Sequence, residues 1–239
     1  QERENVIFLE APYLHVTHLR RSSIKRKYNK FKFELGERAS RNFKFPESLY
    51  LDYPSIVPFP FSQISGINRI KSTLTNHLKT SDEELKNLSR WDPKKYLNIW
   101  TVKSIDGTGS GILGYSFLPP ISPLKDGVGI LYNAYGTTGN LMANVSLGRT
   151  ATHEVGHYLG LKHPWGQVEG DCNEDDEVTD TPQCKDSWGS TAPSCTPFTD
   201  CTQPRQIENY MDYSDDACVD MYTQGQKDRM ITRLTTASY

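Results

Sequence analysis

The chain has 239 residues and a formal net charge of -2, with 23% charged and 11% aromatic residues. This charge excludes a globally basic nucleic-acid-binding protein, and the aromatic content argues against general disorder. No apolar run approaches the roughly 20 residues that a transmembrane helix needs, so we expect no transmembrane span. The chain begins with Gln1 rather than Met, and we interpret it as processed or trimmed.

Composition divides the chain into three zones: residues 1–60, 61–160 and 161–239. The first zone carries a basic run, which we interpret as a solvated face interleaved with strand-forming aromatic residues. Apolar and polar residues alternate over 31–35, which predicts a half-buried strand. The role of residues 1–60 stays open between part of an upper lobe and the remnant of a propeptide.

The middle zone predicts both helices and strands. Ser81 and Glu84 have the spacing of a capping box, which predicts a short helix reaching about Arg90. Further along the chain, the pattern predicts strands over 96–102, 111–119 and 127–132 and a helix over 145–159. Gly160 is expected to end that helix, because glycine readily adopts the left-handed conformation.

The last zone is irregular and holds every cysteine of the chain. No C-x-x-C pair is present, so disulfides are favoured over a cysteine metal site. They imply an oxidising compartment, and we expect a secreted, periplasmic or cell-surface protein. Because the number of cysteines is odd, five, at least one of them lies outside any disulfide within the chain. Thr223 and Gln226 form a second capping box, which predicts a terminal helix to about Leu234.

The stretch from His153 to His163 reads H-E-x-x-H-x-x-G-x-x-H without a gap. On a helix, His153 and His157 share one face and can bind one metal ion, while Glu154 is displaced toward a water molecule on the metal. A break at Gly160 would let His163 return as the third ligand. Three neutral imidazoles suit Zn²⁺ and leave the fourth position open, as in catalytic zinc sites. Glu154 is the expected general base.

A methionine follows this motif, within Asn209-Tyr210-Met211-Asp212-Tyr213. The zinc motif and this methionine together resemble the metzincin metalloendopeptidases. The resemblance implies that Met211 forms a hydrophobic floor beneath the zinc. It also implies that Tyr213 lies near the metal, where it binds zinc or hydrogen-bonds the reaction intermediate.

Within the metzincins, the chain is most similar to the pappalysin family from about residue 65 to its end. The matching stretches are Trp91–Trp100, Leu113-Gly114-Tyr115, Asp126-Gly127-Val128, Asp180-Thr181-Pro182 and Asn209–Cys218. The resemblance implies an α+β, two-lobe catalytic domain. Its upper lobe has a twisted, mostly parallel sheet and the zinc helix, and its irregular, disulfide-bonded lower lobe ends in a C-terminal helix. The strand near 111–117 would pair with an extended substrate.

Several further features are implied by the same resemblance. The disulfides would be Cys172–Cys201 and Cys195–Cys218, which leaves Cys184 over. The acidic loop 171–181 would bind a structural Ca²⁺. The calcium ligands that match best are Asp176, Thr179 and Thr181.

The predicted function is zinc-dependent hydrolysis of peptide bonds in proteins, by a monomer without a nucleic-acid partner. The resemblance points to Asp216 as a carboxylate in the pocket for the residue after the scissile bond, which predicts a preference for Arg or Lys there. An alternative is that Asp215 and Asp216 face solvent or hold calcium. Two alternative functions remain, a binding or adhesion module with a silent zinc site and a latent, zymogen-like form.

Overall fold

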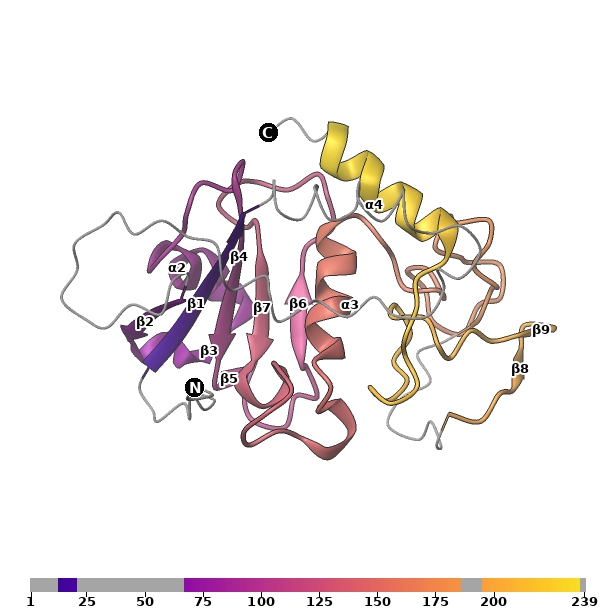
Figure 1. Cartoon of the computed structure of the whole chain (residues 1–239), viewed down its shortest axis with the longest axis horizontal. Coiled ribbons are helices and arrows are strands. Elements are labelled where there is room, and N and C mark those ends of the chain that lie inside the picture. The colour runs from indigo at the N-terminus through magenta and orange to yellow at the C-terminus, as the bar shows by residue number, and fades with distance from the viewer. Residues whose placement is uncertain (1–12, 21–66, 186–194, 237–239) are drawn as a thin grey trace, which may run out of the picture.

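The computed structural model describes residues 13–20, 67–185 and 195–236. The strand expected over 31–35 lies outside these residues. Figure 1 shows the sheet in one half of the molecule, helix α3 (Arg149–Tyr158) beside strand β6 (Gly114–Ser116), and the C-terminal third in the other half. Helix α4 (Gln224–Thr236) runs along the top of this view.

The main sheet has five strands in the order β2-β1-β4-β7-β6. The remaining bounds are Tyr13–Arg20 for β1, Ile67–Lys71 for β2, Tyr96–Val102 for β4 and Val128–Leu131 for β7. Strands β4 and β7 are parallel, whereas β1 is antiparallel to β2 and β4, and β6 is antiparallel to β7. The α+β architecture is confirmed, but this sheet is mixed, with fewer parallel pairings than the expected "mostly parallel" implies. Alternation along one strand carries no information about its neighbour's direction.

Strand β4 is buried on both faces because it lies at the centre of two core clusters. Leu97 and Ile99 point toward α3 and pack with residues of β7 and α4. Trp100 and Val102 point to the opposite face and pack with Leu85 of α2 (Asp82–Asn87). The period of two along a strand explains this division, so one strand joins both cores.

The helices begin and end within a few residues of the predicted positions. Helix α2 begins after Ser81 as predicted but ends at Asn87 rather than about Arg90. Ser81 makes no side-chain capping bond, so the bond expected of the first capping box is wrong. The second capping box is confirmed: Gln226 donates its backbone N–H to Oγ1 of Thr223 (3.1 Å), and Thr223 donates its own to Oε1 of Gln226 (3.0 Å). None of the helices in the described ranges is long and apolar enough to cross a bilayer.

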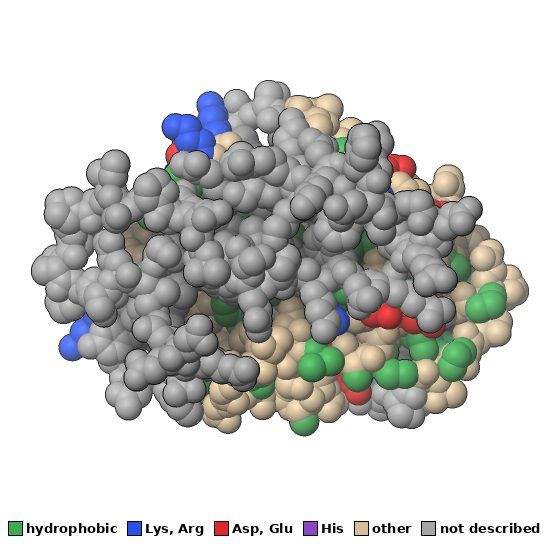
Figure 2. Space-filling model, in the orientation of Figure 1, with side chains coloured by type: hydrophobic (Ala, Val, Ile, Leu, Met, Phe, Trp, Pro, Cys, Tyr) green, Lys and Arg blue, Asp and Glu red, His purple; other side chains and the backbone are tan. Residues whose placement is uncertain are grey.

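The C-terminal third has little regular structure and is held by covalent and polar contacts. Its two short strands are β8 (Thr199–Asp200) and β9 (Gln203–Pro204). In Figure 2, most of the visible acidic side chains lie in the half of the molecule that contains this third. The remaining short elements are β3 (Asn76–His77), β5 (Ser104–Ile105) and 3-10 helices at Thr73–Thr75, Lys79–Ser81, Tyr132–Ala134 and Ala143–Val145.

Candidate active site

Helix α3 carries the first two histidines on one face, and a tight turn returns the third. Gly160 has a φ of +92°, which is the left-handed conformation expected there. Its N–H donates to the carbonyl of His157 (2.8 Å), and the N–H of Leu161 donates to the carbonyl of Gly156 (2.9 Å). These two bonds are those of a Schellman motif, which ends the helix and reverses the chain. His163 therefore comes back to the open face of α3.

The three histidines converge on one point. Nε2 of His163 lies 3.2 Å from Nε2 of His153 and 3.0 Å from Nε2 of His157. Two nitrogens bound tetrahedrally to Zn²⁺ at roughly 2.0–2.1 Å would lie about 3.3 Å apart. The spacing and the chemistry of the three donors therefore fit a zinc ion.

The structure also explains how two of these rings are oriented. Nδ1 of His153 bonds to the carbonyl oxygen of Tyr210 (2.7 Å), and Nδ1 of His157 bonds to that of Leu161 (2.8 Å). A carbonyl partner at Nδ1 leaves Nε2 free to bind metal. Burial lowers the pKa of all three histidines, that of His153 to about 3. The rings are therefore neutral at physiological pH, as metal binding requires.

Glu154 directly follows His153 on α3. Its side chain is buried, and its Oε2 makes no hydrogen bond in the described structure. Burial raises the pKa of Glu154 to about 8. A Cβ added to Gly114 of β6 would lie 2.8 Å from Cγ of Glu154, so the strand backbone passes directly against this side chain. An acid–base group that follows a metal ligand in the chain therefore packs against the end strand of the described sheet.

Met211 lies beneath the histidine-bearing turn of α3. A Cβ added to Gly156 would lie only 2.3 Å from Sδ of Met211, so the close approach depends on glycine at that position. Oδ1 of Asn209 accepts the N–H of Met211 (2.9 Å) and fixes the methionine turn. Met211 is fully buried in the core cluster around α3. Its position fits the hydrophobic floor implied by the family resemblance.

Tyr213 borders the same group of rings. Its ring centroid lies 5.4 Å from that of His153 and 4.9 Å from that of His163. Desolvation, followed by the charge of Glu154, raises the pKa of Tyr213 to about 12. Its hydroxyl therefore stays protonated at neutral pH and is available as a hydrogen-bond donor.

These observations bring six predicted site residues together, the three histidines with Glu154, Met211 and Tyr213. A family profile described as "Pregnancy-associated plasma protein-A" peptidase matches residues 79–235. The chain belongs to this family. It is the pappalysin family to which the sequence motifs pointed.

Several proteins are similar to this pappalysin domain. Extracellular metalloproteases from Arthroderma gypseum and Pyricularia oryzae are 37% and 38% identical to it, covering 56% and 63% of this chain and 46% and 52% of their own. Mature mirolysin of Tannerella forsythia, solved with a cleaved peptide, is 38% identical with a TM-score of 0.53, covering 64% of this chain and 58% of its own. The chain thus spans about half the length of the curated relatives it matches.

Asp216 is buried in this pappalysin domain and close to the beginning of α3. Its Oδ2 accepts the N–H groups of Leu147 (2.8 Å) and Arg149 (3.1 Å). Desolvation raises the pKa of the Asp216 carboxyl, and the two backbone hydrogen bonds oppose that effect. The carboxylate therefore connects the segment after the methionine turn to the helix that carries the zinc motif.

The structure brings only part of the expected calcium set together. Asp176 is buried, and its Oδ1 accepts the N–H of Val178 (2.9 Å). The hydroxyl of Thr181 lies close enough to the Asp176 carboxyl to oppose the rise in its pKa that desolvation causes. Thr179 is exposed. The carbonyl oxygen of Asp176 is already occupied by Nη1 of Arg229 on α4 (2.7 Å). Two of the three predicted ligands are therefore neighbours.

The cysteines pair as the resemblance implied. Cys172 is bonded to Cys201 and Cys195 to Cys218, while Cys184 is buried and belongs to neither disulfide. Cys218 lies two residues after Asp216, so a covalent bond restrains this stretch of chain. Outside the metal site, His77 is buried and bonds through Nε2 to the hydroxyl of Tyr115 (2.7 Å).

Sequence reasoning missed the residues that support the metal ligands from outside. The carbonyls of Tyr210 and Leu161 carry no sequence signal, because every residue has a carbonyl. Trp165, whose ring stacks on His163, gave one accessible signal, an aromatic residue two positions after the third histidine.

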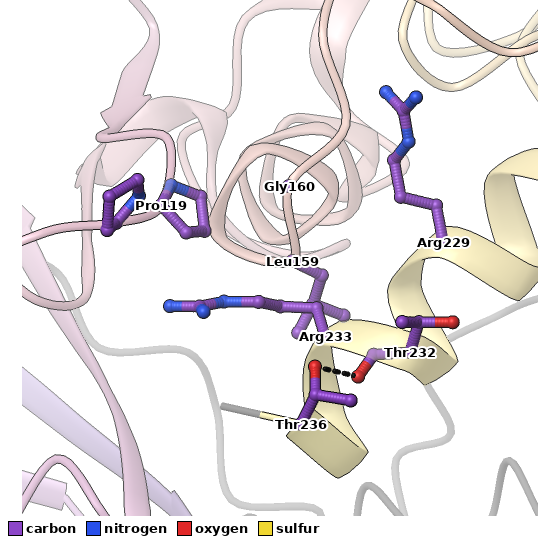
Figure 3. Close-up of a pocket in the computed structure, with 8 residues that line it drawn as sticks. Pro119, Leu159, Gly160, Arg229, Thr232, Arg233 and Thr236 are labelled. Atoms are coloured by element: carbon purple, nitrogen blue, oxygen red, sulfur yellow. Dashed lines mark hydrogen bonds between the residues drawn. The ribbon is translucent and has the colours of Figure 1, made fainter. Parts of the chain in front are cut away.

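A shallow pocket of about 500 Å³ lies apart from these residues, between the end of α3 and α4. Figure 3 shows Arg233 extending from α4 past Leu159, while Arg229 points away. The pocket is lined by Pro119, Pro120, Leu159, Gly160, Arg229, Thr232, Arg233 and Thr236. None of these eight residues is a zinc ligand or catalytic candidate, so the pocket is separate from the active site.

Proposed function

We propose that this pappalysin domain is a zinc-dependent endopeptidase that hydrolyses peptide bonds in proteins. The observation that carries the proposal is the convergence of three imidazole Nε2 atoms beside the buried carboxyl group of Glu154. His153, His157 and His163 would hold the zinc ion, which would supply Lewis-acid activation of water and of the scissile carbonyl. The names and family of the similar proteins support the same class of reaction.

Glu154 acts as the proton carrier in this proposal. Burial raises the pKa of Glu154 to about 8, and the positive charge of a zinc ion at the neighbouring histidines would oppose this by favouring the carboxylate. The carboxylate takes a proton from the attacking water and delivers it to the leaving amine. The hydroxyl of Tyr213, protonated at neutral pH, donates a hydrogen bond to the oxyanion that develops on the scissile carbonyl. Met211 holds the floor beneath the ligands and takes no part in proton transfer.

The substrate binds as an extended strand along β6. Among the described strands this one is at the end of the sheet order, so one of its edges pairs with no other described strand and offers backbone groups for pairing. Because Gly114 lies against Glu154, a peptide on that edge passes close to the proton carrier. Backbone pairing binds many sequences equally, so selectivity must come from side-chain pockets.

The selectivity proposed is for Arg, then Lys, directly after the scissile bond, through Asp216. Its carboxylate is buried and restrained near Cys218, and one oxygen, Oδ2, already accepts two backbone N–H groups. A basic side chain would pair with the carboxylate, Arg in a bidentate way. The variant Asp216→Asn should weaken the basic preference without changing zinc content, and Asp215→Asn is its matched control. A cleavage profile dominated by aliphatic or aromatic residues at that position contradicts the assignment.

We also propose that Asp176 and Thr181 contribute to a structural calcium site, with Thr179 or backbone carbonyls completing it. The support is a buried carboxyl group with a neighbouring hydroxyl in an acidic loop. Calcium should then raise the melting temperature of the zinc-loaded protein. An identical melting curve with and without calcium would reject the site. The two disulfides and the names of the extracellular relatives support secretion.

The decisive experiment compares zinc-loaded wild type with Glu154→Gln on a proteome-derived peptide library. The variant should keep its zinc and lose at least about a hundredfold in rate, the low end for a general base. Glu84→Gln, at an exposed glutamate of α2, is the matched control and should behave as wild type. Zinc-loaded wild type that cleaves no peptide would favour the silent binding module. N-terminal sequencing after incubation would reveal a latent form that trims itself.

A further inference from the structure

His163 is held by a different kind of contact from the other two histidines. The rings of His153 and His157 are oriented by carbonyl oxygens at Nδ1. Among the residues that the structure describes, none makes a hydrogen bond with Nδ1 of His163, which lies on a segment without regular structure. Its ring instead lies parallel to that of Trp165, with centroids 4.4 Å apart and an interplanar angle of 11°. Stacking thus takes the place that a hydrogen bond has at the other two ligands.

Trp165 is itself tightly enclosed by residues from the methionine-turn region. It is buried, and its ring centroid lies 4.9 Å from that of Tyr213 in an edge-on contact. The guanidinium carbon of Arg205 lies over the indole, 5.9 Å from its centroid. An arginine at this distance from a tryptophan face is attracted by the ring's quadrupole. The indole therefore connects a metal ligand to a buried cation.

Arg205 is fixed in turn by two buried carboxylates. Asp212 accepts two hydrogen bonds from the guanidinium, from Nε to Oδ2 (2.8 Å) and from Nη2 to Oδ1 (3.3 Å). Oδ2 of Asp200 accepts a third hydrogen bond, from Nη1 (3.1 Å). The Arg205 and Asp212 side chains are each only 1% exposed. Asp212 stands between Met211 and Tyr213 in the chain, so this ion pair also fixes the backbone that presents Tyr213.

We propose that Trp165 and Arg205 are positioning residues of the zinc site. Trp165 sets the ring plane of His163, and Arg205 secures both Trp165 and, through Asp212, the position of Tyr213. Both side chains are buried, so they act through the residues they hold rather than on the substrate. The proposal rests on the proposed function only in that the metal is zinc, because it concerns how the ligands are held and not the cleavage step.

The test measures metal binding rather than peptidase activity. Zinc affinity is determined by chelator competition, and the visible spectrum of the cobalt-substituted protein reports the ligand geometry. Circular dichroism and thermal melting report folding. The variants are Trp165→Leu, Trp165→Phe and Arg205→Lys. The matched control is Trp91→Leu in the upper lobe, where Trp91 makes an edge-on contact with Tyr96 at 4.9 Å.

Trp165→Leu should weaken zinc binding about 10–100-fold, the usual effect of losing an outer-shell partner, and change the cobalt spectrum. Trp165→Phe should restore both to near wild type, because a flat ring remains for stacking. Arg205→Lys should weaken zinc binding by a smaller factor, because lysine keeps the positive charge but cannot form the bidentate hydrogen bonds to Asp212. Trp91→Leu should leave zinc affinity and spectrum unchanged.

A folded Trp165→Leu variant with wild-type zinc affinity and cobalt spectrum overturns the proposal. So does a Trp165→Phe variant that binds zinc no better than Trp165→Leu. If Trp165→Leu does not fold, Arg205→Lys decides, and wild-type affinity in that variant also overturns it. Wild type that binds zinc but cleaves no peptide overturns the proposed function alone and leaves these affinity ratios intact.

Discussion

Gly156→Ala tests how closely the zinc helix packs on the methionine turn. The added Cβ would lie 2.3 Å from Sδ and 3.3 Å from Cε of Met211, and 3.2 Å from the hydroxyl of Tyr222. Ordinary contacts of this kind are about 3.5–4.0 Å, so Met211 must move by more than about 1 Å. Met211 is fully buried. The turn therefore has to shift together with its side chain.

The magnitude follows from two opposing contributions. Overpacking a buried site costs about 1–3 kcal/mol, while replacing glycine by alanine within a helix gains up to about 1 kcal/mol. We expect a net loss of about 1–2 kcal/mol, and hence a melting temperature lower by about 2–8 °C for a chain of this size. The shift also moves the carbonyl of Tyr210 away from Nδ1 of His153, which should weaken zinc binding about tenfold.

A double-mutant cycle with Met211→Ala separates this contact from a general loss of stability. Met211→Ala alone should cost about 2–5 kcal/mol through the cavity it leaves. In Gly156→Ala/Met211→Ala the new methyl group no longer meets sulfur, so the double variant should lose at least about 1 kcal/mol less than the sum of the two single variants. Urea unfolding of all four proteins measures the cycle. Additive losses, or a Gly156→Ala protein as stable as wild type, refute the reasoning.

Three further predictions concern the tyrosine, the helix end and the acidic loop. Tyr213→Phe should lower kcat by about a hundredfold with zinc content unchanged, and an unaltered kcat removes its role as a donor to the oxyanion. Gly160→Ala should lower the free energy of unfolding, measured in urea, by about 1–2 kcal/mol because the φ of Gly160 is +92°, and Gly160→Asn should lower it less. Equal stability of the wild type and both variants would contradict the left-handed conformation at this position. Desolvation raises the pKa of Asp176 from 3.8 to about 6, so the folded chain binds this proton more tightly than the unfolded chain. In chelator-treated protein, stability should therefore fall as pH rises from about 4 to 6, by about 2 kcal/mol after solvent screening. Asp176→Asn should lack that part of the pH dependence of stability. Identical stability–pH profiles of the variant and the wild type would rule out the contribution of Asp176.

The metal ligands could be predicted from the sequence because their geometry is local. His153 and His157 are one helical turn apart, and Gly160 needs no distant partner to reverse the chain toward His163. The terminal capping box is equally local, since Thr223 and Gln226 bond to each other. At Ser81 the local pattern gave the start of the helix but not the capping bond. Ser81 ends the 3-10 helix Lys79–Ser81, and its φ of -101° and ψ of 27° are not the extended conformation of a capping residue.

Strand directions and the support of the site needed the folded chain. Nothing in the alternation of 96–102 shows that β1 lies beside β4 in an antiparallel register. That register depends on a pairing between residues about 80 positions apart, and periodicity reports only burial. The calcium loop shows the same limit, because composition placed oxygens in one segment and only folding decided that Thr179 is exposed while Asp176 is buried.

The sequence by itself therefore determined the chemistry of this protein: three imidazoles, one carboxyl group and a turn, all within eleven residues of chain. Only the tertiary structure decided what holds that chemistry in place. Trp165 meets Arg205, and Asp216 meets the beginning of α3, across separations of 40 and 67 residues that no local pattern encodes. The spacing of the metal ligands is set within one short stretch of chain and can therefore be recognised in the sequence. The orientation of each ligand ring depends instead on the side chain that packs beside it, which can come from a distant part of the chain.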